Sequence, residues 1–187
     1  AYTFPNSLQN EKFKIPKILH PTQFSTVNGK IQQFNTIYNY IDVLRITNID
    51  IKEKTWTAEF YLDLVSQSDN PLDQVIFNNL SSTNDKFSSK EIWRRKDDDD
   101  YNTVRYYIVA NFDFLAIADN YPFDWQSVYI SMTLKDNSKH ILQPIPLELV
   151  DDEFDINEWH IENAFSGIKY KKNFLYKDTD LKKTATV

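Results

Sequence analysis

Tyr121-Pro122-Phe123-Asp124-Trp125-Gln126 lies between two stretches that have the pattern of β-strands. The stretch before it, Val104–Phe114, is rich in aromatic and β-branched residues. The stretch after it alternates, with one face made by Gln126, Val128, Ile130, Met132 and Leu134. Pro122 fixes its own φ and biases Tyr121 toward an extended conformation, and the side chain of Asp124 can cap the turn. The sequence therefore predicts a rigid turn that carries apolar side chains outward between two strands.

This hexapeptide, called the Pro loop below, resembles the signature loop of pentameric ligand-gated ion channels, which lies at the base of their extracellular ligand-binding domain. In animal members two cysteines bracket the loop, and the matching positions here are Phe114 and Val128. The chain has no cysteine, as in the prokaryotic branch of the family. The resemblance thus implies that apolar packing closes the loop, and that Tyr121–Gln126 couple the domain to a membrane domain or another module. A well-packed corner of the sandwich is the alternative.

The resemblance extends, in the right order, over roughly residues 38 to 170. Residues 40–46 and 55–62 are similar to the first two strands of the family's domain. Pro71-Leu72-Asp73 and Phe77-Asn78 are similar to the segment that carries its first ligand-binding loop, and Trp159-His160-Ile161 to the start of its penultimate strand. The ordered set is more specific than any member except the Pro loop.

The strand patterns predict an all-β fold, an immunoglobulin-like β-sandwich resembling the ligand-binding domain of these channels. In Thr55–Val65 one face is apolar, and the other carries Thr57, Glu59, Tyr61 and Asp63, so we expect one buried face. Short strands are expected at residues 75–77 and 91–95, and longer strands at residues 102–114 and 159–170. Leu142–Leu149 contains two prolines, so it is expected to form no more than an edge strand.

A length of 187 residues predicts one domain. Residues 1–37 are interpreted as an extended lead-in or linker, because they are polar and punctuated by proline, and strands are expected to begin at Ile37. Residues 38–187 would form the ligand-binding sandwich. The tail, Lys171–Val187, is expected to be a loop in which Thr184–Val187 start a last strand that is incomplete by truncation or differs from the family.

The net charge of −6 argues against nucleic acid or an anionic membrane as an electrostatic partner. No apolar run approaches the roughly 18–20 residues of a membrane span, and the chain does not start with a secretory signal pattern. The lack of cysteine is compatible with periplasm or cytoplasm. The resemblance to channels implies an extracytoplasmic location, periplasmic or extracellular, as part of a membrane-attached protein.

Motifs for catalysis are missing from the sequence, which has no nucleophile elbow, P-loop or dinucleotide fingerprint. We therefore expect a protein that is not an enzyme and that has no catalytic residues and no cofactor. His20, His140 and His160 lack the spacing of a metal site, and Asp97–Asp100 indicate a solvated turn, so no metal is expected. Asn79-Leu80-Ser81 is a glycosylation sequon, meaningful only in a eukaryotic secretory route.

Members of the resembled family bind small ligands, often amines or amino acids, in a pocket between subunits that aromatic side chains line. The resemblance implies the following candidate ligand-binding residues: Asp73 and Phe77 in the first loop, Tyr170, Phe174 and Tyr176 in the third, and Trp93, Tyr106 or Tyr107 on the complementary face. The second loop, near Lys135–His140, offers no aromatic residue, which weakens an amine-binding aromatic box. Core packing is the alternative for each of these aromatic residues, and it is favoured for strand positions such as Tyr106 and Tyr107.

These observations favour a small-molecule-sensing domain of a membrane receptor, attached to a membrane or signalling module and pentameric if the receptor is a channel. Its small-molecule ligand is not identified by the sequence. One alternative keeps the fold as a module of a bacterial multi-domain sensor or a periplasmic-binding-protein fusion. Another is a stand-alone β-sandwich that binds carbohydrate or protein.

Overall fold

The computed structural model describes residues 22–27, 30–82, 86–96, 100–115, 126–136, 140–145, 164, 167–172 and 181–186. These residues form strands and a short 3-10 helix. The elements are β1 (Thr22–Val27), β2 (Lys30–Asp50), β3 (Thr55–Ser66), η1 (Pro71–Gln74), β4 (Val75–Phe77), β5 (Phe87–Lys96), β6 (Asn102–Asp113), β7 (Ser131–Leu134), β8 (His140–Pro144), β9 (Gly167–Lys172) and β10 (Leu181–Thr186). The predicted all-β sandwich is confirmed.

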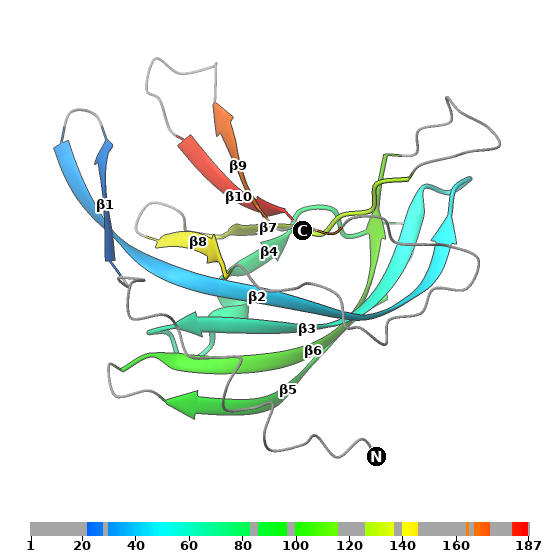
Figure 1. The fold of residues 1–187 in the computed structure, drawn as a ribbon, viewed down its shortest axis with the longest axis horizontal. Coiled ribbons are helices and arrows are strands. Elements are labelled where there is room, and N and C mark those ends of the chain that lie inside the picture. Colours follow the sequence, from blue (N-terminus) through cyan, green and yellow to red (C-terminus); the bar gives the residue numbers. More distant parts are fainter. Residues whose placement is uncertain are drawn as a thin grey trace.

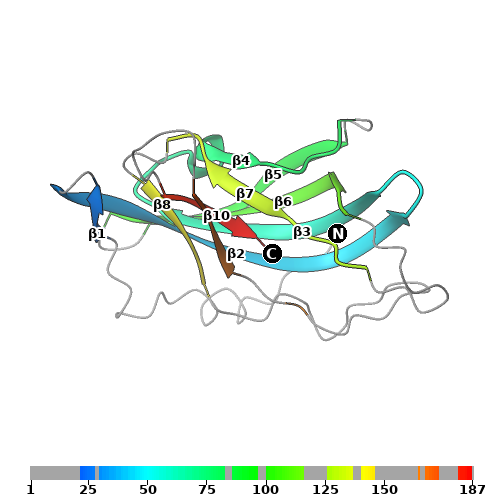
Figure 2. The same ribbon diagram turned by 90° about the horizontal axis from the view of Figure 1, so that it is seen from above.

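Two sheets make up the sandwich. The six-stranded sheet has the order β1-β2-β3-β6-β5, and β8 pairs in parallel with β2. The four-stranded sheet has the order β4-β7-β10-β9. In Figure 1 the strands β2, β3, β6 and β5 run side by side, and Figure 2 shows the long curvature of β2 and β3 from the edge. No helix in the described part of the chain has the length and apolar character needed to cross a membrane.

The main core lies between the two sheets. Alternating side chains of β3 and β6 point into it, because successive residues of a strand face opposite sides. Phe60 and Phe112 are fully buried there, with ring centroids 6.1 Å apart. From the smaller sheet, Phe77 of β4 and Met132 of β7 belong to the same cluster. We call the side of the six-stranded sheet that faces this core the inter-sheet face.

The predicted alternation after the Pro loop is borne out by burial, although the regular strand is shorter than expected. Ile130, Met132 and Leu134 are buried, whereas Ser131 and Thr133 are half-buried. Only Ser131–Leu134 form a strand, and residues 126–130 lie outside regular structure. The regular strand is short because the neighbouring strands pair with it only over this stretch: β4 lies opposite Met132–Leu134, and β10 lies opposite Ser131 and Met132.

Several sequence-based boundaries need correction. Strands begin at Thr22 rather than at Ile37, since β1 and the first residues of β2 form an antiparallel hairpin. The tail is not a loop throughout, because Leu181–Thr186 form β10, which pairs with both β9 and β7. Strand β5 extends over Phe87–Lys96 instead of residues 91–95, because all of it lies against β6. Asp63 is fully buried although it lies on the face of β3 that was expected to be exposed.

The two positions that match the bracketing cysteines of animal channels are both packed against apolar neighbours. Phe114 is buried in the inter-sheet core, and Val128 packs against the same cluster. Apolar packing is therefore present at both positions that bracket the Pro loop, as expected for a chain without cysteine. Residues Tyr121–Trp125 of the loop lie outside the described residues, and Gln126 is half-buried.

Candidate functional site

The face of the six-stranded sheet that points away from the inter-sheet core carries a row of aromatic and charged residues, and we call it the polar face. Strand register builds this row. Asp63 of β3 pairs with Arg105 of β6, and Arg105 in turn pairs with Trp93 of β5. One rung further along, Tyr61 of β3 pairs with Tyr107 of β6. Residues directly opposite each other on neighbouring strands are close enough to interact, so the register brings together residues far apart in sequence.

Two β-bulges adjust which side chains reach this face. The register shift between Val43 and Arg45 lets both Asp42 and Arg45 lie on the same side, opposite Tyr61 and Glu59 respectively. A second shift, between Glu91 and Trp93, places Trp93 opposite Arg105. A bulge inserts one residue and re-aims the side chains that follow it. Without these bulges Arg45 and Trp93 would be directed toward the opposite side of the sheet.

An ion pair lies at the centre of the polar face. The Arg105 guanidinium donates from Nε to Asp63 Oδ1 at 2.8 Å and from Nη2 to Asp63 Oδ2 at 2.9 Å. The side chain of Asp63 is 0% exposed and that of Arg105 is 9% exposed. Two parallel bonds of this kind are strong and fix the orientation of both groups. The pair is therefore a rigid centre around which the aromatic residues are arranged.

Aromatic rings lie against the guanidinium of Arg105. Its central carbon is 4.8 Å from the centroid of the Tyr61 ring and 5.8 Å from that of Trp93. A cation over a ring face is attracted by the electron density of the ring, and the attraction grows where water is excluded. Tyr61 and Trp93 are themselves half-buried, so part of each ring remains accessible to solvent.

Burial and mutual attraction shift the pKa values of both Asp63 and Arg105. Desolvation raises the pKa of Asp63 from 3.8 to about 6, although the hydrogen bonds and charge of Arg105 act in the opposite direction. The pKa of Arg105 is raised, because the bonds and charge of Asp63 outweigh the burial that disfavours its cation. At neutral pH the carboxylate and the guanidinium are therefore both charged.

A second, more accessible group lies beside the ion pair. The Tyr107 hydroxyl donates to Glu59 Oε2 at 3.0 Å, and Glu59 Oε1 lies 4.0 Å from Nη1 of Arg45. The rings of Tyr107 and Tyr61 have centroids 5.9 Å apart. Burial, followed by the bond to Glu59, raises the pKa of Tyr107. The Arg45 side chain is 64% exposed, which makes it the solvent-facing end of this group.

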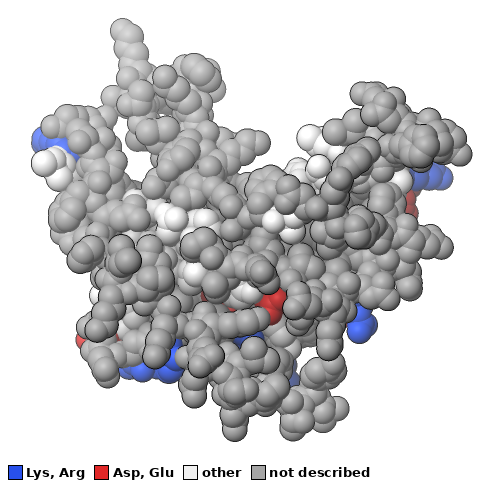
Figure 3. Space-filling model, viewed as in Figure 1, with Lys and Arg blue, Asp and Glu red and all other residues white. Residues whose placement is uncertain are grey.

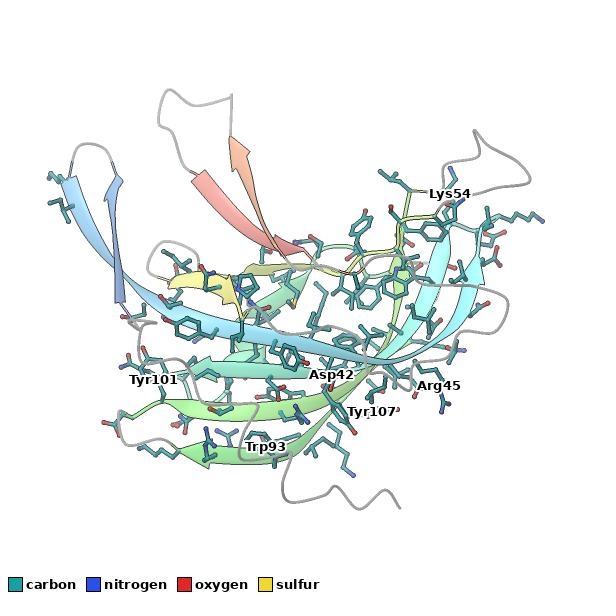
Figure 4. All side chains as sticks on the ribbon, in the orientation of Figure 1. Asp42, Arg45, Lys54, Trp93, Tyr101 and Tyr107 are labelled. Atoms are coloured by element: carbon teal, nitrogen blue, oxygen red, sulfur yellow. The ribbon has the colours of Figure 1, made fainter. Side chains whose placement is uncertain are left out.

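Figure 4 shows how the labelled side chains lie. Lys54 lies at the turn between β2 and β3, at one end of the six-stranded sheet, and Tyr101 lies toward the opposite end. Between them are the side chains of Asp42, Arg45, Tyr107 and Trp93. In Figure 3 the described Lys and Arg side chains that are visible occur at several separate places. The rings of Tyr61, Trp93 and Tyr107, the carboxylate of Glu59 and the guanidinium of Arg45 together give the polar face groups that suit a small polar ligand.

The candidate residues implied by the family resemblance fall in different environments. Trp93 and Tyr107 both lie on the polar face. The ring centroid of Trp93 is 5.8 Å from the central carbon of the Arg105 guanidinium, and Tyr107 follows Arg105 on the same face of β6. Asp73 is exposed on η1. Phe77 is 8% exposed and packs in the inter-sheet core against Phe60 and Phe112, which is the alternative that the sequence left open for aromatic residues.

The remaining candidates belong to the tail. Tyr170 lies on β9, where its backbone pairs with Lys183 of β10. Phe174 and Tyr176 lie outside the described residues, as do Asp97–Asp99 and His160. His20 is outside them as well, whereas His140 begins β8. The role of the third ligand-binding loop therefore stays a prediction from the family resemblance.

Sequence reasoning missed the centre of this site. Asp63, Tyr61 and Glu59 were placed together on one face of β3, but neither Arg105 nor Arg45 was singled out. A useful signal was available, since an arginine at an interior position of a strongly apolar strand needs a partner. The identity of that partner could not be read, because Asp63 and Arg105 are 42 residues apart in sequence.

Other candidate sites are weaker. One cavity, of about 20 Å³, lies where β2, β8 and the segment after β3 meet, and Thr36, Ser68, Gln74 and Tyr101 are among its lining residues. That volume accommodates about one water molecule. Among the residues that the structure describes, no three His, Cys, Asp or Glu side chains are grouped to hold a metal ion.

Comparison with known proteins identifies the fold. The chain matches none of the protein-family models and none of the curated proteins. Among solved structures it is similar to the acetylcholine-binding protein AChBP from Bulinus truncatus, whose structure was described as revealing the conserved scaffold of nicotinic acetylcholine receptors. The TM-score is 0.56 at 13% identity, over 81% of this chain and 84% of that one. The β-sandwich of receptor ligand-binding domains, as expected from the Pro loop, is thereby confirmed as the fold.

Proposed function

We propose that this chain is the extracytoplasmic small-molecule-sensing domain of a membrane receptor built like a prokaryotic, cysteine-free pentameric ligand-gated channel. The observation that carries the proposal is the clustering of half-buried Tyr61, Trp93 and Tyr107 around a fixed ion pair on one face of a receptor-type sandwich. The similarity to AChBP supports it through the fold. Binding, not chemistry, is the activity proposed.

Ligand recognition would use the accessible part of the polar face. Ring surfaces of Tyr107 and Trp93 contribute apolar contact and attract cations, while Glu59 and Arg45 offer a charged acceptor and a charged donor. The buried Asp63–Arg105 pair is already satisfied within the protein, so its role is to hold the rings in place. Rigid placement of rings before binding lowers the entropic cost of binding.

Signalling would follow from a difference in affinity between two arrangements of the domain. A ligand shifts such an equilibrium only by as much as it prefers one state. In a receptor of this type the ligand would settle at a boundary between subunits, and the Pro loop would pass the change to the membrane module. The partner of the polar face would then be a second copy of this chain.

A titration of the purified chain tests the binding proposal. Primary amines, amino acids and small carboxylates are added while tryptophan fluorescence and the thermal midpoint are followed. At least one class is expected to bind, and Trp93→Phe and Tyr107→Ala should weaken it by about fivefold to tenfold, as loss of roughly 1–1.4 kcal/mol implies. Tyr129→Phe is the matched control, because Tyr129 packs against the inter-sheet core instead. Equal affinity in all four proteins would place the ligand elsewhere.

The receptor half of the proposal has its own test. The coding sequence on both sides of this chain is determined, and four apolar spans of about 20 residues after Val187 would establish a channel. A single span followed by a signalling domain, or a large α/β module before Ala1, would instead identify a sensor that uses the same sandwich.

A further inference from the structure

Asn79 lies two residues beyond β4, between the end of β6 and the start of β7. Its side-chain amide reaches both strands. Nδ2 donates to the carbonyl oxygen of Asp113 at 2.9 Å and to that of Tyr129 at 2.7 Å, and Oδ1 accepts from the backbone N–H of Ser131 at 2.9 Å. All three bonds connect one side chain to backbone groups on the two sides of the Pro loop.

Backbone hydrogen bonds support the same bridge. The N–H of Asp113 donates to the carbonyl oxygen of Asn79 at 2.8 Å, and that of Asn78 to the carbonyl oxygen of Ser131 at 2.8 Å. A further bond joins Ser81 N–H to the carbonyl oxygen of Asn111 at 2.9 Å. Since β6 belongs to the six-stranded sheet and β7 to the four-stranded sheet, residues 78–81 join the two sheets at this edge.

The chemistry of this position suits asparagine. A primary amide has two N–H donors and one carbonyl oxygen, and here both donors and the oxygen are used. Aspartate would present an acceptor to two carbonyl oxygens, and alanine would leave three backbone groups without their partner. An unpaired polar backbone group that is removed from water is costly, so substitution should loosen the contacts on both strands.

We propose that the Asn79 side chain is the positioning residue that holds together the two segments flanking the Pro loop, the end of β6 at Asp113 and residues 129–131 before and in β7. Asp113 and Tyr129 are each one residue away from Phe114 and Val128, the positions that match the bracketing cysteines of animal channels. The amide therefore supplies, without a covalent bond, a direct polar link between the two flanks of the loop. This inference stands whether or not the polar face binds a ligand.

The proposal also bears on the sequon Asn79-Leu80-Ser81. The nitrogen that would carry a glycan is the one that donates to Asp113 and Tyr129. Attachment of a sugar would replace one of these two hydrogens. In the folded protein this sequon therefore has a structural use that competes with glycosylation.

Amide hydrogen exchange, followed by NMR on the whole chain, tests the role of Asn79. The informative proton is the N–H of Ser131, whose acceptor is the Asn79 side chain. In Asn79→Ala it should exchange about tenfold faster, the factor that corresponds to loss of one net hydrogen bond of about 1.4 kcal/mol. The N–H of Ile108, in the middle of β6, should keep its wild-type rate, because the change is local.

Asn78→Ala is the matched control. Within the described residues, the Asn78 side chain donates from Nδ2 to the Ser131 hydroxyl and accepts at Oδ1 from the Thr133 hydroxyl, and neither bond involves the N–H of Ser131. Its loss should leave the exchange of Ser131 N–H unchanged. The proposal is overturned if Asn79→Ala retains wild-type protection at Ser131, if Asn78→Ala accelerates it equally, or if Ile108 accelerates as much as Ser131. Should Asn79→Ala fail to fold, Asn79→Ser, whose single hydroxyl cannot reach both carbonyl oxygens, is measured against the same criteria.

Discussion

The two faces of the six-stranded sheet are stabilised in different ways. On the inter-sheet face, Phe60 and Phe112 are fully buried among other apolar side chains, and any partner of similar size and polarity would serve. On the polar face, Asp63 is equally buried, but it depends on one partner, Arg105. The difference between Phe60 or Phe112 and the Asp63–Arg105 pair is that burial of the rings stabilises the fold, whereas burial of the ion pair fixes the position of particular groups.

The largest expected effect comes from breaking the inter-sheet face. The ring of Phe112 lies 5.5 Å from that of Trp56, 6.1 Å from that of Phe60 and 6.1 Å from that of Phe77. Phe112→Ala should lower the free energy of unfolding by about 4 kcal/mol, through lost burial and the cavity left behind. Urea denaturation measures it. Phe87→Ala is the control, because Phe87 is 43% exposed, and its effect should be about 1 kcal/mol.

Removal of one partner of the ion pair should have the next largest effect. Arg105→Met leaves the carboxylate of Asp63 buried without a counter-charge, which should cost about 3–4 kcal/mol. The double variant Asp63→Leu with Arg105→Met replaces both groups by apolar ones. It should be more stable than Arg105→Met alone, and a simple sum of the two single losses would contradict the pairing that separates the faces.

The pH dependence of the free energy of unfolding gives a further test of the polar face, because the pKa of Asp63 differs between the folded and the unfolded chain. Its folded pKa, about 6, lies above the ordinary value of 3.8, so the folded state takes up this proton more readily. The contribution of Asp63 to stability is therefore greatest below about pH 4 and is lost as the pH rises through about 6, a total change of about 3 kcal/mol. Urea denaturation of wild type and Asp63→Asn across this range gives the difference. A constant difference would show that Asp63 has an ordinary pKa.

The smallest effects are expected at the accessible end of the polar face. Tyr107→Phe removes the hydrogen bond to Glu59 and should lower the free energy of unfolding by about 1 kcal/mol. Arg45→Ala should change it by less than about 0.5 kcal/mol, because the Arg45 side chain is mostly exposed and its contact with Glu59 is long. Thermal unfolding ranks the two variants. A larger loss in Arg45→Ala would show that the charges, rather than the ring, organise this end.

The two faces of the six-stranded sheet differ in how well the sequence predicts them. Alternation in residues 55–65 predicted both faces of β3 correctly, because side chains of a strand alternate regardless of its partners. It failed on the burial of Asp63, since that depends on β6. The strand onset at Thr22 was missed because polar and proline-rich sequence was interpreted as linker, whereas pairing with β2 stabilises β1. The family resemblance points to Trp93 and Tyr107, whereas the alternation of β3 places Tyr61 on a face of the strand but predicts no functional role for it.

By itself, the sequence determined the all-β class and the strands that make the core, because these depend on local periodicity. Only the tertiary structure decided which residues meet across strands. The ion pair of Asp63 and Arg105, the bulges that direct Arg45 and Trp93 to the polar face, and the reach of Asn79 to both flanks of the Pro loop all depend on register. Register is a property of pairs of strands, and no single stretch of sequence contains it.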